Sequence, residues 1–270
     1  MTAMIVRLDQ SYPTFDGTRL RYDLFRSPSD KPLPLVICIH GGGWISGDKS
    51  DMGEVARMIA QAGFAAACPQ YRLAPLFPYP AAVDDVLSFV RFCRTQAEAW
   101  SIDPRRIASF GNSAGGHLAA MAGLLDRPPS DKGDGPSAKV DAVVSLCGIF
   151  DLTDPGEQHF PISIAFLTQF LGSSYEGHEA TWREASPITH VGSHAAPFLI
   201  VHGDVDDIVP VTQSRTLAAA LGKHGVPVVY RELPGEGHAF SYAAWSDILR
   251  WSTEFLEKTL QHGNRTEHPS

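Results

Sequence analysis

A serine in a tight, glycine-flanked turn is the first residue whose type and setting could do chemistry. Residues 111–115 read GNSAG and match the pattern G-x-S-x-G. They lie between an apolar run at 106–110, typical of a strand, and a helical pattern at 114–125. Such a turn lifts the serine hydroxyl above a sheet and points a helix N-terminus at it. The context predicts Ser113 as a nucleophile and disfavours the alternative, a glycine-rich turn of a nucleotide-binding fold.

A serine hydroxyl needs a base, and the chain offers eleven histidines. His238 lies in PGEGHAF at 234–240, a glycine-containing loop after the last predicted strand. His117 follows Ser113 by four residues and is expected to pack along the same helix. His202 ends a predicted strand, and a structural role in the turn is expected for it. We therefore predict His238 as the base.

The base needs a carboxylate to orient it. HGDVDDIVP at 202–210 follows a predicted strand and supplies three acidic residues. We predict that Asp206 orients the imidazole, with Asp207 as the alternative, whereas Asp204 is expected to hydrogen-bond within the turn. The resulting order along the chain, serine, aspartate and then histidine, is the order associated with the α/β-hydrolase sheet.

The attacked carbonyl oxygen develops negative charge and needs N–H donors. HGGGW at 40–44 follows the apolar run at 35–39, and its glycines let backbone amides approach a ligand. The predicted donors are the amides of Gly42, Gly43 and Ala114. The amide of Trp44 is an alternative to one of them. A dinucleotide-binding loop is excluded because Ser46 occupies the position of its third glycine.

The elements that must position these groups follow from the hydrophobic pattern. Apolar, β-rich runs alternate with helical patterns, which indicates an α/β fold with a mostly parallel, twisted sheet and helices on both faces. The predicted strands are 4–9, 19–25, 35–39, 64–69, 106–110, 140–146, 196–201 and 226–233, of which the first two form an antiparallel pair. The predicted helices are 52–62, 81–99, 114–125, 212–223 and 241–260. Because the chemistry spans most of the chain, we predict a single domain over residues 1–270.

The stretch 150–189 departs from this alternation and holds an apolar helix at 162–171, followed by Gly172. An insertion between two strands can form a small lid or a wall of the pocket. Packing against a second copy in a homodimer is the alternative, and both interpretations stay open. Trp44 and Asn112, beside the predicted donors and nucleophile, are expected to contact the substrate.

Composition excludes other classes of function. The chain is 44% hydrophobic, and its 22 basic and 30 acidic residues give a formal net charge of −8. This is typical of a soluble globular protein and disfavours general nucleic-acid binding. No apolar run approaches the ~20 residues of a membrane helix, and residues 1–10 do not resemble a secretory signal. We therefore expect a cytoplasmic protein without a membrane or nucleic-acid partner.

Patterns for metals and cofactors are also missing from the sequence. The four cysteines are scattered without a CxxC pair, and neither HExxH nor GxxxxGK occurs. The cysteines are interpreted as free thiols, and we expect no metal and no cofactor.

Several of these motifs occur together in one order, which is more specific than any one of them. They are HGGGW at 40–44, GDK at 47–49, YRLAP at 71–75, PYPAAVDDV at 78–86, GNSAGGHLA at 111–119, HGDVDDIVP at 202–210 and GEGHAF at 235–240. The set resembles α/β-hydrolase esterases of the hormone-sensitive-lipase-like group. It is most similar to the smaller carboxylesterases and feruloyl-esterase-like enzymes, which also resemble kynurenine formamidases.

The resemblance implies the α/β-hydrolase fold and the same site. It assigns the triad to Ser113, Asp206 and His238, and the oxyanion hole to Gly42, Gly43 and Ala114. Tyr71 and Asp85 match positions that tie the region together without reacting. About 34 residues precede the HGGGW strand, fewer than the N-terminal helical cap of that group needs, so a more open pocket is expected.

The implied reaction is hydrolysis of small carboxylic esters, with short-chain acyl or aryl groups, through an acyl-enzyme. An arylformamidase, or another small-amide hydrolase that uses the same triad, is the alternative. A non-catalytic ligand-binding protein on a hydrolase fold is a remote alternative, disfavoured because all three triad residues are present.

Overall fold

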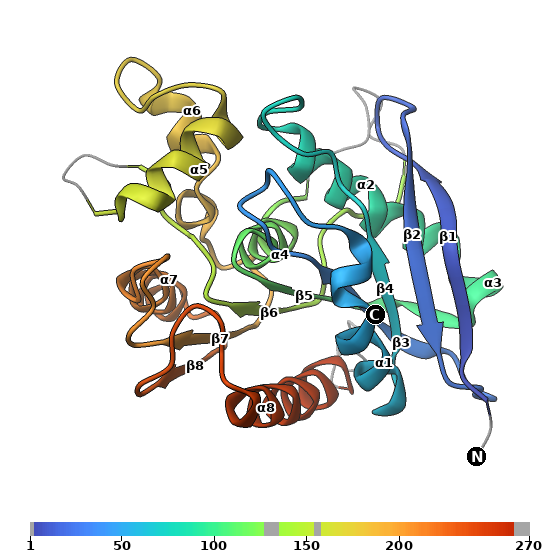
Figure 1. Cartoon of the computed structure of the whole chain (residues 1–270). Coiled ribbons are helices and arrows are strands. Elements are labelled where there is room, and N and C mark those ends of the chain that lie inside the picture. Colours follow the sequence, from blue (N-terminus) through green and yellow to red (C-terminus); the bar gives the residue numbers. More distant parts are fainter. Residues whose placement is uncertain (1–2, 127–134, 154–157, 262–270) are drawn as a thin grey trace, which may run out of the picture.

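The structure is a computed structural model of the chain, and it describes residues 3–126, 135–153 and 158–261. These residues form one eight-stranded sheet flanked by helices (Figure 1). The order of the strands across the sheet is β1-β2-β4-β3-β5-β6-β7-β8. The strands are β1 (Ile5–Pro13), β2 (Arg19–Arg26), β3 (Leu33–Ile39), β4 (Ala65–Pro69), β5 (Ile102–Asn112), β6 (Ala142–Leu146), β7 (Phe198–Gly203) and β8 (Val228–Leu233).

Strand direction divides the sheet into two parts. β1 pairs with β2, and β2 with β4, in antiparallel register. From β4 to β8 all neighbouring strands are parallel. The predicted α/β sheet and its opening antiparallel pair are thus confirmed. Because parallel strands end at a common edge, the loops after β3, β5, β6 and β7 emerge close together.

Helices cover both faces of the sheet, as the continuous apolar strands require. On β3, Leu35 and Ile37 pack in the cluster that holds the buried residues of α2 and α4. Val36 and Cys38 point the other way, into the cluster that includes α1 and α8. Figure 1 shows α1 and α8 together on this second face.

The helices largely follow the prediction. They are α1 (Gly53–Gln61), α2 (Ala81–Thr95), α3 (Ala97–Trp100), α4 (Ala114–Leu124), α5 (Pro161–Leu171), α6 (Glu179–Glu184), α7 (Thr212–Lys223) and α8 (Tyr242–Gln261), with 3-10 turns η1 (Lys49–Met52) and η2 (Pro187–His190). Among the described residues, none of these helices is long and apolar enough to cross a membrane.

One predicted helix, 81–99, is wrong in its extent. The chain leaves the helix at Gln96 and forms the short α3. The break lets Trp100, 2% exposed, pack its ring against Tyr22 and Phe92, with ring centroids 5.2 and 5.7 Å apart. Burial of this large aromatic ring outweighs the local helical pattern.

The predicted helix at 162–171 is present as α5, and the chain ends it at Gly172 with a φ of +71°. A left-handed residue after the last helical turn is the usual place for glycine. α5 and α6 lie together on the opposite side of the molecule from β1 (Figure 1).

Candidate active site

Ser113 lies in the turn from β5 into α4, and this turn is strained. Its φ and ψ are 56° and −123°, values uncommon for a residue with a side chain. The Ser113 amide donates to the carbonyl of Leu146, 2.8 Å away, and so ties the turn to β6. The backbone is packed so closely that a Cβ on Gly115 would lie 2.2 Å from the Ile39 oxygen. The small residues of the G-x-S-x-G pattern are therefore required by contact between backbones.

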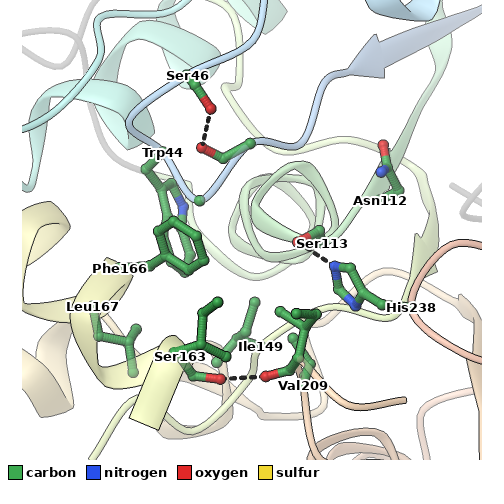
Figure 2. A pocket seen from close by; sticks show the side chains of 14 residues that line it. Trp44, Ser46, Asn112, Ser113, Ile149, Ser163, Phe166, Leu167, Val209 and His238 are labelled. Carbon is green, nitrogen blue, oxygen red and sulfur yellow. Dashed lines mark hydrogen bonds between the residues drawn. The ribbon is translucent and has the colours of Figure 1, made fainter. Parts of the chain in front are cut away.

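Ser113, His238 and Asp206 form one hydrogen-bonded chain, drawn in part in Figure 2. His238 Nε2 lies 2.9 Å from Ser113 Oγ, and His238 Nδ1 lies 2.8 Å from Asp206 Oδ2. With Nδ1 protonated, the ring donates to the carboxylate and accepts the serine proton at Nε2. The structure thus brings together the three residues predicted as the triad. Asp204 accepts instead from the Gly235 amide, at 2.7 Å, within the turn.

Asp206 is buried, and hydrogen bonds occupy both of its oxygens. Oδ1 accepts hydrogen bonds from the amides of Ile208 and Val209, which lie 2.9 and 2.8 Å away. Burial alone would raise the pKa of Asp206. The hydrogen bonds from His202, His238 and the Val209 amide outweigh it and hold that pKa far below its usual value. Asp206 is therefore an anion at any ordinary pH, as an orienting carboxylate must be.

The pKa of His238 shifts the other way. Burial lowers it, but the hydrogen bond to Asp206 and the contact with Cys147 raise it above its usual value overall. The protein thus favours the imidazolium that forms when the base takes a proton. The side chain is 21% exposed, so the ring still reaches solvent.

His202 is a second imidazole on the same carboxylate, and the sequence prediction of a role in the turn was incomplete. Its Nε2 lies 3.0 Å from the Val209 carbonyl and 3.1 Å from Asp206 Oδ2. Its Nδ1 lies 2.7 Å from Ser214 Oγ at the start of α7. Because a carbonyl only accepts, Nε2 carries a proton that the carboxylate shares. The HGxxD spacing, which places both side chains on one turn, could have pointed to this contact.

The HGGGW loop turns sharply at the edge of the pocket, where Gly42, Gly43 and Trp44 line it. Gly42, Gly43 and Trp44 have φ values of +104°, +58° and +61°. A Cβ on Gly43 would lie 2.6 Å from the Phe166 ring, so only glycine fits there. Within the described part of the chain, the amides of Gly42 and Gly43 make no hydrogen bond. Ala114 opens α4, where the first amides lack partners within the helix. Their role as donors to an oxyanion stays a prediction.

Trp44 is 1% exposed and lies in the wall of the pocket. Its Nε1 donates to His117 Nδ1 at 3.2 Å, and its ring stacks on Phe170 with centroids 4.4 Å apart. His117 Nε2 in turn lies 2.8 Å from the Ala185 carbonyl. Burial lowers the pKa of His117 to about 4, so this ring is neutral. It holds the wall and is not placed to act as the base.

A cavity of about 330 Å³ lies over Ser113 (Figure 2). Ser113 and His238 stand on one side of it, and α5 forms the facing wall. The lining residues are Gly42, Gly43, Trp44, Ser46, Asn112, Ser113, Ile149, Ile162, Ser163, Phe166, Leu167, Ile208, Val209 and His238. Asn112 lines the cavity and is half-buried, and its contact with substrate stays a prediction. Apart from the reacting groups, the lining is mostly apolar.

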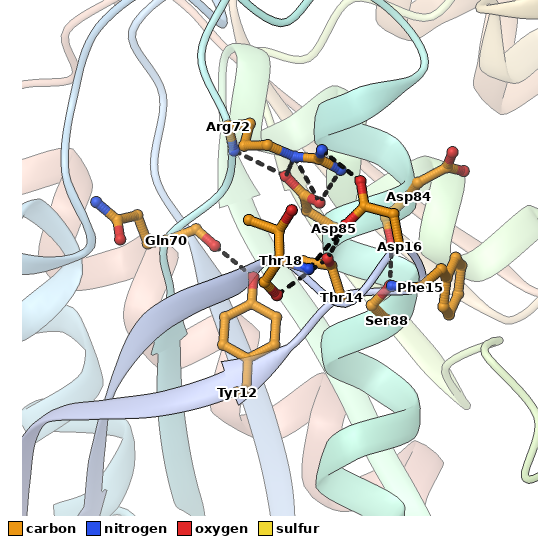
Figure 3. Close-up of polar contacts among 10 residues, drawn as sticks. All are labelled: Tyr12, Thr14, Phe15, Asp16, Thr18, Gln70, Arg72, Asp84, Asp85 and Ser88. Atoms are coloured by element: carbon orange, nitrogen blue, oxygen red, sulfur yellow. Dashed lines mark hydrogen bonds and ion pairs between the residues drawn. The ribbon is translucent and has the colours of Figure 1, made fainter.

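Tyr71 supports the glycine loop, whereas Asp85 belongs to a network away from the pocket. Tyr71 Oη donates to the carbonyls of His40 and Gly41, at 3.0 and 3.2 Å, under the glycine loop. Asp85 accepts hydrogen bonds from Arg72 Nη2, 2.6 Å away, and from the Arg72 backbone amide, 2.9 Å away (Figure 3). Arg72 Nη1 also reaches Asp16, 2.7 Å away in the turn between β1 and β2. This network ties the antiparallel pair to α2 and does not touch the pocket.

Comparison with known proteins agrees with the fold and the motifs. The model of the BD-FAE family matches residues 23–221. The esterase LipC of Mycobacterium tuberculosis is 34% identical over 216 residues, covering 78% of this chain and 54% of LipC. The ethyl acetate hydrolase of Pseudomonas putida is 30% identical over 247 residues, covering 86% of this chain and 74% of that protein. The chain spans about half the length of LipC and of the esterase LipQ from the same organism.

Solved structures give the same result for the fold. The apo form of Thermogutta terrifontis esterase 2 is 25% identical, with a TM-score of 0.78 over 93% of this chain and 94% of that one. A truncated carbohydrate esterase from gut microbiota superposes with a TM-score of 0.77 at 24% identity, over 94% and 97% of the two chains. The sheet, the nucleophile turn and these matches together show that the chain is an α/β-hydrolase of the BD-FAE family.

Proposed function

We propose that the protein is a serine carboxylesterase that hydrolyses small carboxylic esters through an acyl-enzyme. The hydrogen-bonded chain from Ser113 through His238 to Asp206, opening into an apolar cavity, carries this proposal. Relatives named as esterases and as an ethyl acetate hydrolase support it.

The first half of the reaction forms the acyl-enzyme. His238 Nε2 takes the Ser113 proton while Oγ attacks the acyl carbonyl carbon. The carbonyl oxygen becomes an anion and accepts hydrogen bonds from the amides of Gly42, Gly43 and Ala114. Collapse of this intermediate breaks the ester bond, and the alcohol leaves with the proton from His238.

The second half regenerates the enzyme. Water attacks the acyl-serine carbonyl and gives its proton to His238, and the acid leaves as Ser113 recovers the proton. Throughout, the Asp206 anion keeps the Nδ1 proton in place and stabilises the imidazolium.

The pocket supports small acyl or aryl groups as substrates. A cavity of about 330 Å³ is at the lower end of the range for small-molecule sites. Phe166 and Leu167 of α5 close it opposite the nucleophile. A series of p-nitrophenyl esters from acetyl to decanoyl should therefore show kcat/KM highest at the short end. Equal activity along the series would contradict the small-substrate assignment.

We further propose that residues 150–189 form a pocket wall within a single domain, because α5 supplies lining residues and packs on the core. The four buried free cysteines support a cytoplasmic location. A homodimer formed through the same stretch stays a prediction, which sedimentation would check.

The proposal is tested by removing the nucleophile. Ser113→Ala should lower kcat for p-nitrophenyl butyrate by about 10⁵–10⁶-fold and abolish labelling by a fluorophosphonate. Ser163→Ala is the matched control, because this pocket serine donates to the Ile208 carbonyl and does not contact His238. It should keep labelling and activity within about tenfold. Labelling of Ser113→Ala, or faster turnover of an aryl formamide than of the ester, would overturn the assignment.

A further inference from the structure

A cysteine that the proposed mechanism does not use lies against the base. Cys147 follows the last residue of β6, and its amide donates to the Val201 carbonyl at 2.8 Å. Its φ is +41°, in the left-handed region, which is uncommon for a residue with a side chain. Sγ lies 3.7 Å from the His238 carbonyl, and the residue is 1% exposed.

Three different ligand atoms meet at this point. Cys147 Sγ, a carboxylate oxygen of Asp206 and a ring nitrogen of His238 all lie within 4.8 Å of one another. A tetrahedral zinc site, with Zn–S of about 2.3 Å and Zn–N or Zn–O of about 2.0–2.1 Å, separates its ligand atoms by roughly 3.3–3.6 Å. Side-chain shifts of about an ångström would therefore bring the three atoms to bonding distance.

The types of these atoms select the ion. Thiolate and imidazole favour Zn²⁺ or Cd²⁺ over Mg²⁺ and Ca²⁺, which need several oxygen ligands. The site offers three protein ligands and leaves a fourth position open, and the His238 side chain lines the cavity. We propose that Cys147, His238 and Asp206 form an inhibitory site for a thiophilic divalent cation, which switches off the esterase proposed above.

Inhibition follows from the proton on His238. The cation takes the place of the Nδ1 proton between the ring and Asp206 Oδ2, and that proton moves to Nε2. The Cys147 thiol releases its proton to solvent and binds as the thiolate. One proton is thus released for each cation that binds the neutral ring. A second is released where His238 starts as the imidazolium, because Nε2 is then already protonated, and nothing is oxidised or reduced. Nε2 now carries a hydrogen and cannot accept the proton of Ser113.

The test uses Cd²⁺, because a cadmium–thiolate bond absorbs in the ultraviolet independently of catalysis. Enzyme freed of metals with a chelator should gain this absorbance, release between one and two protons per Cd²⁺ in weak buffer, and lose activity in parallel. Mg²⁺ should do none of these. Zn²⁺ should inhibit and release the same number of protons without the absorbance band.

Cys147→Ser should remove the band and raise the Cd²⁺ concentration for half-inhibition by at least about tenfold. Cys68→Ser is the matched control, because Cys38 and Cys68 lie in contact in the core and could bind Cd²⁺ themselves. It should leave inhibition unchanged. Should Cys147→Ser fail to fold, Cys147→Ala makes the same comparison.

A wild-type enzyme without the band, or inhibition of Cys147→Ser at the wild-type concentration, would overturn the site. If the protein instead fails to hydrolyse esters, the band and the released proton still report on the metal. The two proposals therefore fail in distinguishable ways.

Discussion

Two aspartates, Asp206 and Asp85, have side chains fully removed from solvent and saturated with hydrogen bonds, yet their settings differ. Asp85 meets the guanidinium of Arg72, a cation that keeps its charge at any ordinary pH. Asp206 meets two imidazoles, those of His202 and His238, and the ring of His238 reaches the cavity.

Their pKa values reflect this difference. Burial raises the pKa of Asp85 despite Arg72, whereas hydrogen bonds lower that of Asp206 despite burial. A buried carboxylate with a permanent cation fixes two parts of the fold. A buried carboxylate that orients a histidine ring beside a pocket, as Asp206 orients His238, can instead assist proton transfer. Variants of the two should therefore affect different properties.

The largest effect is expected from Asp206→Asn on catalysis. The amide can still accept from the Ile208 and Val209 backbone, but it no longer holds the Nδ1 proton on His238. We expect kcat to fall by about 10⁴-fold with KM little changed. Steady-state kinetics with p-nitrophenyl butyrate, beside a thermal melt of the same protein, measures this. Activity within tenfold of wild type would remove Asp206 from the triad.

Asp85→Asn should instead act on stability. Arg72 would lose its fully buried anionic partner and keep Asp16, so the free energy of unfolding should fall by about 3 kcal/mol. Urea denaturation measures the loss. The turnover per fluorophosphonate-reactive site should stay near wild type, since the network does not line the cavity. A large fall in kcat per reactive site would show that the two aspartates are not separate in function.

The residues of the triad could be predicted from the sequence because each lies in a short local pattern. Ser113, Asp206 and His238 each occupy a short pattern at a strand end, so local context is enough to select them, and the structure places them in contact. Their roles stay predictions until the variants are measured. The sheet was predictable for a related reason, since apolar strands buried on both faces have few alternatives.

What the sequence did not indicate depends on contacts between distant segments. Cys147 lies against His238, 91 residues away in the chain, and no metal pattern spans that separation. The break before α3 depends on space for the Trp100 ring beside Tyr22. The need for glycine at position 43 depends on Phe166 of α5, which lies far along the chain and packs against this loop.

The pH dependence separates the two aspartates by a smaller effect. His238 acts as a base only when neutral, so kcat/KM should rise with pH through its pKa, which lies above the usual 6.5. In Asp206→Asn the hydrogen bond that raises the His238 pKa weakens, while the burial that lowers it remains. The rise of kcat/KM with pH should therefore move to lower pH by about one unit. Asp85→Asn should leave it in place. If the pH at which kcat/KM rises were the same in both variants, a group other than His238 would control it.

The same shift predicts how stability depends on pH. Because the folded pKa of His238 is raised, its charged pairing with Asp206 stabilises the fold fully below about pH 6.5. This contribution is lost as the pH rises through the folded pKa. The lowered pKa of Asp206 contributes stability above about pH 4, lost only as the pH falls toward its folded value. Chemical denaturation of wild type and Asp206→Asn across this range measures both.

The smallest effect is expected from Asp16→Asn, which tests the exposed end of the Arg72 network. Asp16 is 53% exposed, and its Oδ1 accepts from Thr14 and Thr18 within the turn, bonds that an asparagine oxygen can keep. The substitution thus removes mainly the charge facing Arg72. The free energy of unfolding should fall by less than about 1 kcal/mol, and less still in high salt. A loss as large as that of Asp85→Asn would mean that the network depends on its charge more than on burial.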